Sequence, residues 1–255
     1  MEQNSPRPIS QKNRFKIEAK NIIAIASGKG GVGKSTFAVN LSISLKQKGY
    51  SVGILDADIY GPNQHIIFKL EDQKPEVKMI GEKKNFLPII SNDIKINGMG
   101  FILEPDKAAM WRGPMLSGAI KQLVDLTEWG DLDYLFIDMP PGTGDAYLTV
   151  AKDIKPDSVI LVTSSSPLSI QDTIKSKILF NHLKIPIIGY INNMSYSLCP
   201  KCGEKIADYD ELNISEKLDL IELGLLPRCN ELANNDFIGS SIYFDPIYNE
   251  LLKLV

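Results

Sequence analysis

The sequence has few cysteines and histidines, and it has no long hydrophobic run. Three of its 255 residues are cysteine and two are histidine, and in a soluble chain with no export signal such cysteines are expected to be thiols or metal ligands rather than disulfides. The first 20 residues are polar, include two prolines and lack the apolar segment of a secretory signal. No apolar run reaches membrane-spanning length. We therefore expect a cytoplasmic protein with no membrane partner, whose cysteines are thiols or metal ligands.

An excess of basic residues is also missing. The formal net charge is -3, so the chain does not create the positive field that holds a nucleic-acid backbone, and we expect no nucleic-acid partner. The hydrophobic content of 44% suffices for a sizeable core. We expect residues 1–20 to form a mobile tail and residues 21–255 to form one domain.

Apolar runs of strand length alternate with longer segments of helical periodicity. The runs are continuously apolar, which is typical of parallel strands covered by helices on both faces. The expected strands are Ile22–Ser27, Val52–Leu55, Tyr134–Ile137, Ser158–Thr163, Ile185–Ile191 and Leu223–Leu226. The expected helices are Ser35–Lys48, Met115–Thr127 and Ser169–Leu183, the last with a Ser169-x-x-Asp172 start signal. The sequence predicts a doubly wound α/β fold, with Gly61–Phe101 as an excursion that contains a hairpin.

A glycine-rich segment connects the first expected strand to the first expected helix. It fits the phosphate-loop pattern G-x-x-x-x-G-K-[ST], in which backbone N–H groups surround a phosphate, Lys34 supplies a cation and the Ser35 hydroxyl binds Mg²⁺. A plain glycine turn needs neither the Lys-Ser pair nor four glycines in six positions. We expect a nucleoside triphosphate to bind here. The candidate nucleotide-binding residues of the loop are Gly28, Lys29, Gly30, Gly31, Val32, Gly33, Lys34, Ser35 and Thr36.

The loop carries a second cation, Lys29, directly after its first glycine. A lysine on the outer lip of the loop is badly aimed at its own β-phosphate, but it can reach across a two-fold axis into the site of a partner subunit. The alternative is one more solvated lysine. We expect Lys29 and Lys34 to act in catalysis.

Two acidic sites follow expected strands, at the sheet edge where open parallel sheets bind ligands. In the first, Asp56-Ala57-Asp58, we expect Asp58 to position the attacking water and Asp56 to support magnesium, although an Asp in a turn can also serve as a local cap. In the second, Asp138 ends an apolar run before a proline- and glycine-rich loop. That context is typical of a carboxylate that holds magnesium beside a loop that senses the γ-phosphate.

Several motifs together resemble a known family. GKGGVGKST, DADIYGPNQ, MWRGPM at Met110–Met115, DMPPGTGD at Asp138–Asp145 and NNMS at Asn192–Ser195 are similar to the Mrp/ApbC iron–sulfur cluster carrier ATPases, within the MinD/ParA/nitrogenase iron protein class. The resemblance extends from about Asn21 to Pro227 and implies slow ATP hydrolysis with Lys29 acting in trans. It also implies that Asn193 contacts the adenine and that the Pro227 region closes over the base. The chain departs from the family pattern at Glu204–Glu211 and at Leu226–Cys229.

The segment Cys199-Pro200-Lys201-Cys202-Gly203 allows two thiolates to converge on one metal. Two ligands are too few for tetrahedral zinc or a cubane cluster, but two copies of the pair around a two-fold axis supply four. With the family resemblance, we expect a 4Fe–4S cluster on Cys199 and Cys202 of a homodimer, which passes it to apo iron–sulfur proteins. Half a zinc site or a redox dithiol are the alternatives, and Cys229 is interpreted as a packing residue.

A different function remains open, namely a MinD/ParA-type positioning or partition switch that dimerises with ATP on a membrane or on DNA. Such a switch favours a basic amphipathic C-terminal helix or a basic face. The segment Ile247–Val255 has one Lys and one Glu, so we expect its apolar stripe to pack on the domain. Nitrogenase-like electron transfer is a third possibility, but there the ligand cysteines are separated in sequence.

Overall fold

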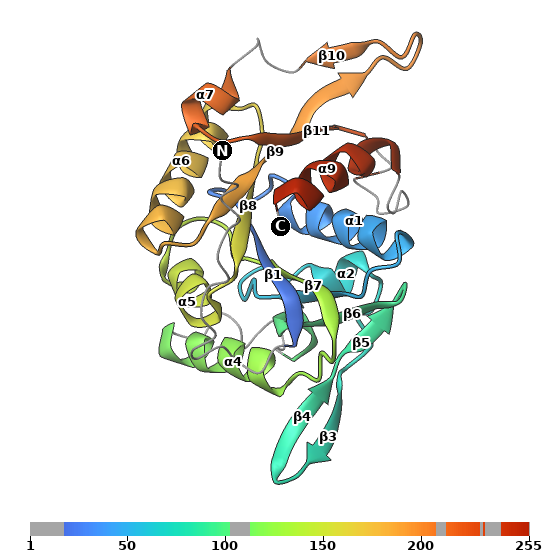
Figure 1. The fold of residues 1–255 in the computed structure, drawn as a ribbon, viewed down its shortest axis with the longest axis vertical. Coiled ribbons are helices and arrows are strands. Elements are labelled where there is room, and N and C mark those ends of the chain that lie inside the picture. The colour runs from blue at the N-terminus through green and yellow to red at the C-terminus, as the bar shows by residue number, and fades with distance from the viewer. Residues whose placement is uncertain (1–17, 103–112, 208–212, 230–231, 233–240, 255) are drawn as a thin grey trace, which may run out of the picture.

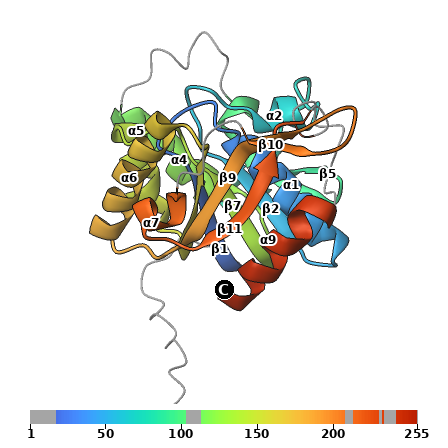
Figure 2. The same cartoon turned by 90° about the horizontal axis from the view of Figure 1, so that it is seen from above.

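The fold is a mostly parallel sheet with helices on both faces (Figures 1 and 2). The computed structural model describes residues 18–102, 113–207, 213–229, 232 and 241–254. The main sheet of this described part has the strand order β10-β9-β8-β1-β7-β2-β6-β5, and β11 also pairs with β9. This arrangement confirms the predicted α/β class.

The central strands are almost wholly buried, as their continuous apolar runs predict. Parallel pairing joins β1, β2, β6, β7, β8, β9 and β11, whereas β5 and β10 pair antiparallel with β6 and β9. The bounds are β1 Ala19–Ala26, β2 Val52–Asp56, β5 Ile89–Ser91, β6 Ile94–Gly98, β7 Leu132–Asp138, β8 Ser158–Thr163, β9 Ile187–Leu198, β10 Lys205–Ala207 and β11 Glu222–Pro227. Strand β1 thus begins within the predicted tail 1–20.

Helices cover the sheet in two layers, with α4, α5, α6 and α7 on one face and α1 and α9 on the other (Figure 2). Alternate residues of β1 face the two layers: Ile22 and Ala24 join one apolar cluster, and Ile23 and Ile25 join the other. The bounds are α1 Lys34–Gln47, α2 Gln64–Ile67, α4 Gly113–Leu126, α5 Asp145–Ile154, α6 Pro167–His182, α7 Ile214–Leu218 and α9 Ser241–Leu254, with a 3-10 turn at Met99–Phe101.

Two sequence predictions were wrong in detail. Helix α6 begins at Pro167 rather than Ser169, because proline suits the first helical turn, where an N–H has no partner. The Ser169 hydroxyl instead accepts the Ser164 N–H at 3.1 Å. The excursion 61–101 is only partly separate from the sheet: β3 Glu76–Ile80 and β4 Lys83–Leu87 form the hairpin, but β6 belongs to the main sheet beside β2.

The C-terminal helix packs on the body of the molecule. Phe244, Ile247 and Leu251 of α9 are buried in the cluster that also contains Phe37 of α1, and the Phe37 and Phe244 rings lie 6.1 Å apart. The predicted packing of the apolar stripe is therefore confirmed. In the described part of the chain, no helix combines the length and the apolar character needed to cross a membrane.

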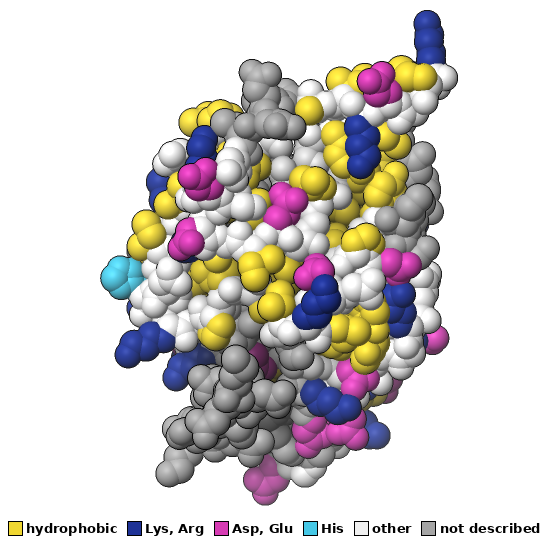
Figure 3. Space-filling view, turned by 45° about the horizontal axis from the view of Figure 1, so that its top comes forward, with side chains coloured by type: hydrophobic (Ala, Val, Ile, Leu, Met, Phe, Trp, Pro, Cys, Tyr) yellow, Lys and Arg dark blue, Asp and Glu magenta, His cyan; other side chains and the backbone are white. Residues whose placement is uncertain are grey.

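Strand β9 extends beyond the body and ends in a hairpin with β10 (Figure 1). Its 12 residues include Asn193, which follows the residue paired with the last residue of β8. The strand ends at Leu198, directly before Cys199. Figure 3 shows the end of this hairpin as a projection with a basic side chain at its tip. The cysteine pair therefore lies at the tip of an element that projects from the sheet.

Candidate nucleotide and metal sites

The phosphate loop connects β1 to α1 in the geometry that its glycines permit. Gly31 and Gly33 have φ angles of 79° and 83°, values that favour glycine because a Cβ atom would be strained there. Gly33 precedes α1, and no side chain caps the N-terminus of this helix. Its first backbone N–H groups are therefore available to a phosphate, with the helix dipole adding to the attraction.

Two glycines of the loop also permit close approaches to other elements. A Cβ atom on Gly28 would lie 2.1 Å from the Asp172 carbonyl oxygen of α6, and one on Gly33 would lie 2.2 Å from Asn193 Nδ2. Asn193 uses this closeness to donate from Nδ2 to the Val32 carbonyl at 2.8 Å. The loop is thus held between α6 and the end of β9.

Lys34 is buried and forms an ion pair with Asp138 through Nζ and Oδ1. The other oxygen, Asp138 Oδ2, accepts a hydrogen bond from Gln64 Nε2 at 2.8 Å, and Gln64 Nε2 also lies 3.4 Å from the Ser35 carbonyl oxygen. The cation of the phosphate loop therefore neutralises the carboxylate at the end of β7.

Asp56 and Asp58 are buried at the end of β2, beside this ion pair. Asp56 Oδ2 accepts the backbone N–H groups of Asn63 and Gln64, each at 2.9 Å, and Asp56 Oδ1 accepts that of Asp58 at 3.0 Å. Burial and the neighbouring Asp138 raise the pKa of Asp56 to about 7. Burial also raises the pKa of Asp58, against the opposing effect of Lys34. Asp56 therefore anchors the turn into α2, whereas Asp58 accepts the backbone N–H groups of Gly61, at 3.1 Å, and of Tyr60.

The donor chemistry of this cluster fits a magnesium ion. Three buried carboxylates, Asp56, Asp58 and Asp138, surround the single lysine Lys34, so the site holds more negative than positive charge. Carboxylate and hydroxyl oxygens are the ligands that magnesium prefers. Across the described residues, however, no group of three or more His, Cys, Asp or Glu is arranged to hold a metal ion. Such a site fits an ion whose remaining ligands are waters and nucleotide phosphates.

The loop after β7 lies against the phosphate loop. The Gly142 N–H donates to the Ser27 carbonyl at 3.1 Å, and Gly142 has a φ angle of 88°. A Cβ atom on Gly30 would lie 3.8 Å from Pro141 Cβ. Lys29, the residue after Gly28 in the phosphate loop, has an exposed side chain, whereas the side chain of Lys34 is buried.

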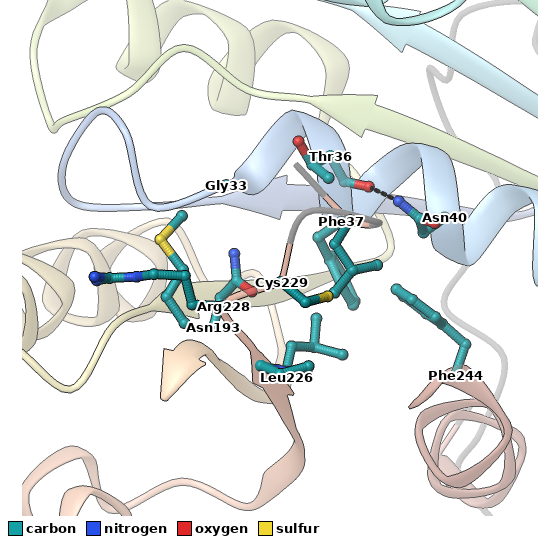
Figure 4. Close-up of a pocket in the computed structure, with 12 residues that line it drawn as sticks. Gly33, Thr36, Phe37, Asn40, Asn193, Leu226, Arg228, Cys229 and Phe244 are labelled. Carbon is teal, nitrogen blue, oxygen red and sulfur yellow. Dashed lines mark hydrogen bonds between the residues drawn. The ribbon is translucent and has the colours of Figure 1, made fainter. Parts of the chain in front are cut away.

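A cavity of about 180 Å³ opens beside the start of α1. Figure 4 shows the cavity between side chains of α1, β9, β11 and α9 and the segment that follows β11. It is lined by Gly33, Thr36, Phe37, Asn40, Asn193, Met194, Leu226, Pro227, Arg228, Cys229, Leu232 and Phe244. The cavity therefore combines mostly apolar walls with the amides of Asn40 and Asn193, next to the last glycine of the phosphate loop.

The two paired cysteines lie in the turn between β9 and β10. The Cys199 N–H donates to the Glu204 carbonyl, and the Gly203 N–H donates to the Cys199 carbonyl, both at 2.8 Å. Cys202 is exposed, Cys199 is partly exposed, and neither forms a disulfide. The backbone N–H groups of Cys202 and Lys201 point at the Cys199 sulfur and lower its pKa. Backbone geometry thus favours a thiolate at Cys199.

The structure brings most of the predicted nucleotide residues together: the phosphate loop, Asp56, Asp58 and Asp138 meet at one edge of the sheet, and Asn193 and Pro227 line one cavity. It places Cys199 and Cys202 outside this edge, at the hairpin tip. Met110, Trp111 and Arg112 of the MWRGPM motif lie outside the described residues.

Sequence reasoning missed Gln64, and it missed Phe37, Phe244 and Cys229 as cavity residues. Gln64 stands at the end of the DADIYGPNQ motif, which was its only signal. Phe37 and Phe244 are separated by most of the chain and carry no motif.

Comparison with known proteins agrees with this geometry. Residues 18–243 match the ParA family described as NUBPL iron-transfer P-loop NTPases. An iron-sulfur cluster carrier protein from Pyrococcus horikoshii is 41% identical over 86% of this chain and 78% of its own length. One from Pseudomonas fragi is 46% identical over 72% of this chain. The match spans 63% of the Pseudomonas protein and 61% of its Synechocystis counterpart.

Solved structures show the same fold. A nucleotide-binding protein from Archaeoglobus fulgidus in complex with ADP has 32% identity and a TM-score of 0.72, over 87% of each chain. The cell division ATPase MinD of Pyrococcus furiosus has 20% identity and a TM-score of 0.67, over 92% of this chain and 99% of its own, a likeness of fold alone. Because the family model matches residues 18–243 of this chain, the chain belongs to the NUBPL iron-transfer family of P-loop NTPases.

Proposed function

We propose that this protein is an ATP-binding and slowly hydrolysing iron–sulfur cluster carrier. A homodimer holds a 4Fe–4S cluster as its cargo and passes it to apo-proteins in the cytoplasm, where thiols stay reduced. The proposal rests above all on two neighbouring thiols, the exposed Cys202 and the partly exposed Cys199 with its lowered pKa, on a chain that also carries a complete phosphate loop. The carrier names of relatives over 40% identical support it.

ATP would bind with its phosphates on the loop Gly28–Thr36 and its adenine in the cavity beside α1. The cavity adjoins the loop at Gly33 and offers apolar walls for the faces of the base and the Asn193 amide for its edge. Pro227, at the end of β11, would cover the base. The homologous Archaeoglobus structure contains ADP, which supports a nucleotide as the ligand.

Hydrolysis would begin with a change of partner at Lys34. This lysine is paired with Asp138, and the phosphate oxygens of a bound nucleotide would draw its Nζ toward the loop. Ser35, Asp56 and Asp138 would then hold magnesium, which neutralises phosphate charge when bound. Asp58, the carboxylate with the fewest backbone partners at the end of β2, would orient the attacking water. Lys29, exposed on the lip, would reach the phosphates of the partner subunit.

The cluster would be held between subunits, because each chain offers only the two thiols of one turn. Four cysteine thiolates are the usual ligand set of a 4Fe–4S cluster, and a two-fold axis through two hairpin tips would supply them. A cluster at such an exposed junction could be released when the nucleotide changes the dimer geometry.

A positioning switch that binds membranes through its C-terminal helix is less well supported. The apolar face of α9 is buried against α1 and β11, so it is not available for a lipid surface.

Anaerobic reconstitution with iron and sulfide tests the cargo. We expect a coloured protein with about four iron atoms per two chains, which follows from four thiolates per cluster. The double variant Cys199→Ala/Cys202→Ala should remain colourless, and Cys229→Ala, which removes a thiol of the base cavity, is the matched control and should bind iron as the wild type does. Equal iron in the double variant would show that these cysteines are not the ligands, and a zinc-loaded wild type would favour half a zinc site in each subunit.

A further inference from the structure

Gln64 is fully buried where β2, β7 and the phosphate loop meet, and only one end of its side-chain amide is satisfied. Its Nε2 donates to Asp138 Oδ2 at 2.8 Å and lies 3.4 Å from the Ser35 carbonyl oxygen. Its Oε1 is buried and has no hydrogen-bond partner among the described residues. A buried amide oxygen without a donor is costly, so its retention calls for a function.

The orientation of the amide follows from the charge of its neighbour. An ionised carboxylate only accepts hydrogen bonds, so the NH₂ group must face Asp138, and the reversed amide would place two oxygens against each other. The backbone adds a second constraint, since the Gln64 N–H donates to Asp56 Oδ2 at 2.9 Å. Gln64 is thus bonded to the carboxylates of Asp56 and Asp138. These two bonds fix its position and leave Oε1 as the amide atom without a partner among the described residues.

The residues around Gln64 are those to which the proposed function gives the magnesium ion, namely Ser35, Asp56 and Asp138. Magnesium keeps several of its waters when it binds to proteins, and each of these waters is a strong hydrogen-bond donor. When Lys34 moves to the phosphates, Asp138 loses its cation but keeps the Gln64 amide.

We propose that Gln64 positions the hydrated magnesium ion: its NH₂ group orients Asp138, and its Oε1 accepts a hydrogen bond from a water of the ion's hydration shell. Gln64 is a positioning residue that does not contact the metal itself. This role rests on the proposed function, because it requires a nucleotide–magnesium complex at the phosphate loop.

Calorimetric titration with ADP, with and without magnesium, tests this role independently of turnover. For Gln64→Met, which keeps the shape but has no hydrogen-bonding group, we expect the gain in ADP affinity from magnesium to fall about ten-fold, the effect of losing one good hydrogen bond. ADP affinity without magnesium should stay within about two-fold of the wild type. If Gln64→Met does not fold, Gln64→Asn, one methylene too short for its partners, replaces it with the same expectation.

Asn63→Ala is the matched control, because the exposed Asn63 side chain bonds the Gly61 carbonyl at 2.7 Å, away from the site.

The remaining outcomes are distinct. A wild type that binds no ADP would contradict the proposed function itself. A wild type with magnesium-dependent binding that Gln64→Met leaves unchanged would overturn only the inference about Gln64.

Discussion

Lys34 and Asp138 are a buried pair of opposite charges at the candidate nucleotide site. Both side chains are buried and neutralise each other, and a buried charge is tolerated only with such a partner. The sequence identified both residues by their motifs, but no motif reveals that the lysine rests on the carboxylate. That contact depends on the register between β1 and β7, in which Ile25 lies beside Asp138.

Removing one member of this pair should therefore destabilise the nucleotide-free protein. We expect Lys34→Met to lower the free energy of unfolding by about 3–5 kcal/mol, because Asp138 is left buried without its cation. The double variant Lys34→Met/Asp138→Asn should recover most of this loss but should still not hydrolyse ATP. Urea denaturation measures both, and a single variant as stable as the wild type would show that the pair does not stabilise the fold.

Cys199 should react as a thiolate at lower pH than an ordinary cysteine, because the backbone N–H groups of Cys202 and Lys201 stabilise its charged form. In a Cys202→Ala/Cys229→Ala variant, the midpoint of the alkylation rate against pH should lie below that of the same protein unfolded in urea. A lowered pKa means that the thiolate gains population as pH rises through the lower midpoint. Equal midpoints in the folded and unfolded protein would contradict this prediction.

At the scale of elements, the phosphate loop depends on its contact with α6. A Cβ atom on Gly28 would lie 2.1 Å from the Asp172 carbonyl, whereas one on Gly30 would find its nearest neighbour at 3.8 Å. These two glycines belong to the same motif, so the difference between them arises from packing alone.

Gly28→Ala should consequently destabilise the nucleotide-free protein by about 1–3 kcal/mol, the usual cost of overpacking. Gly30→Ala, the matched control, should change the free energy of unfolding by no more than about 0.5 kcal/mol. Thermal or urea unfolding compares them, and equal losses in the two variants would mean that the approach to α6 is not rigid.

Elements with a strong periodic signal were predicted well, and those that depend on distant partners were not. The continuous apolar runs of β1, β2, β7 and β8 located these strands within three residues. Strand β6 was assigned to the excursion because its only mark is the short apolar pattern Ile94-x-Ile96, and its parallel pairing with β2 comes from tertiary contacts. The site shows the same division: motifs located the phosphate loop and the carboxylates, but Gln64 and the cavity walls depend on packing.

At the scale of the whole molecule, the proposed dimer makes each active site dependent on two chains. Lys29→Ala should reduce hydrolysis while ADP affinity stays close to that of the wild type, since the exposed Lys29 contributes little to its own site. An equal mixture of Lys29→Ala and Asp58→Asn proteins should regain about a quarter of wild-type activity. Half of the random dimers are mixed, and each mixed dimer contains one complete site.

Steady-state ATPase assays on the mixture and on each variant alone provide the comparison. Activity no greater than the average of the two variants would place Lys29 in its own subunit's site. Such a result would leave the phosphate loop itself unaffected.

Strand β9 connects the phosphate loop to the cysteine turn through one continuous stretch of chain. It bonds the phosphate loop through Asn193 and ends at the residue before Cys199, and five residues lie between these two positions. With ATP bound as proposed, a tilt of the strand at Asn193 would move the thiols at its far end. Communication between nucleotide and cargo would then need no chain of side chains, because the covalent backbone carries it.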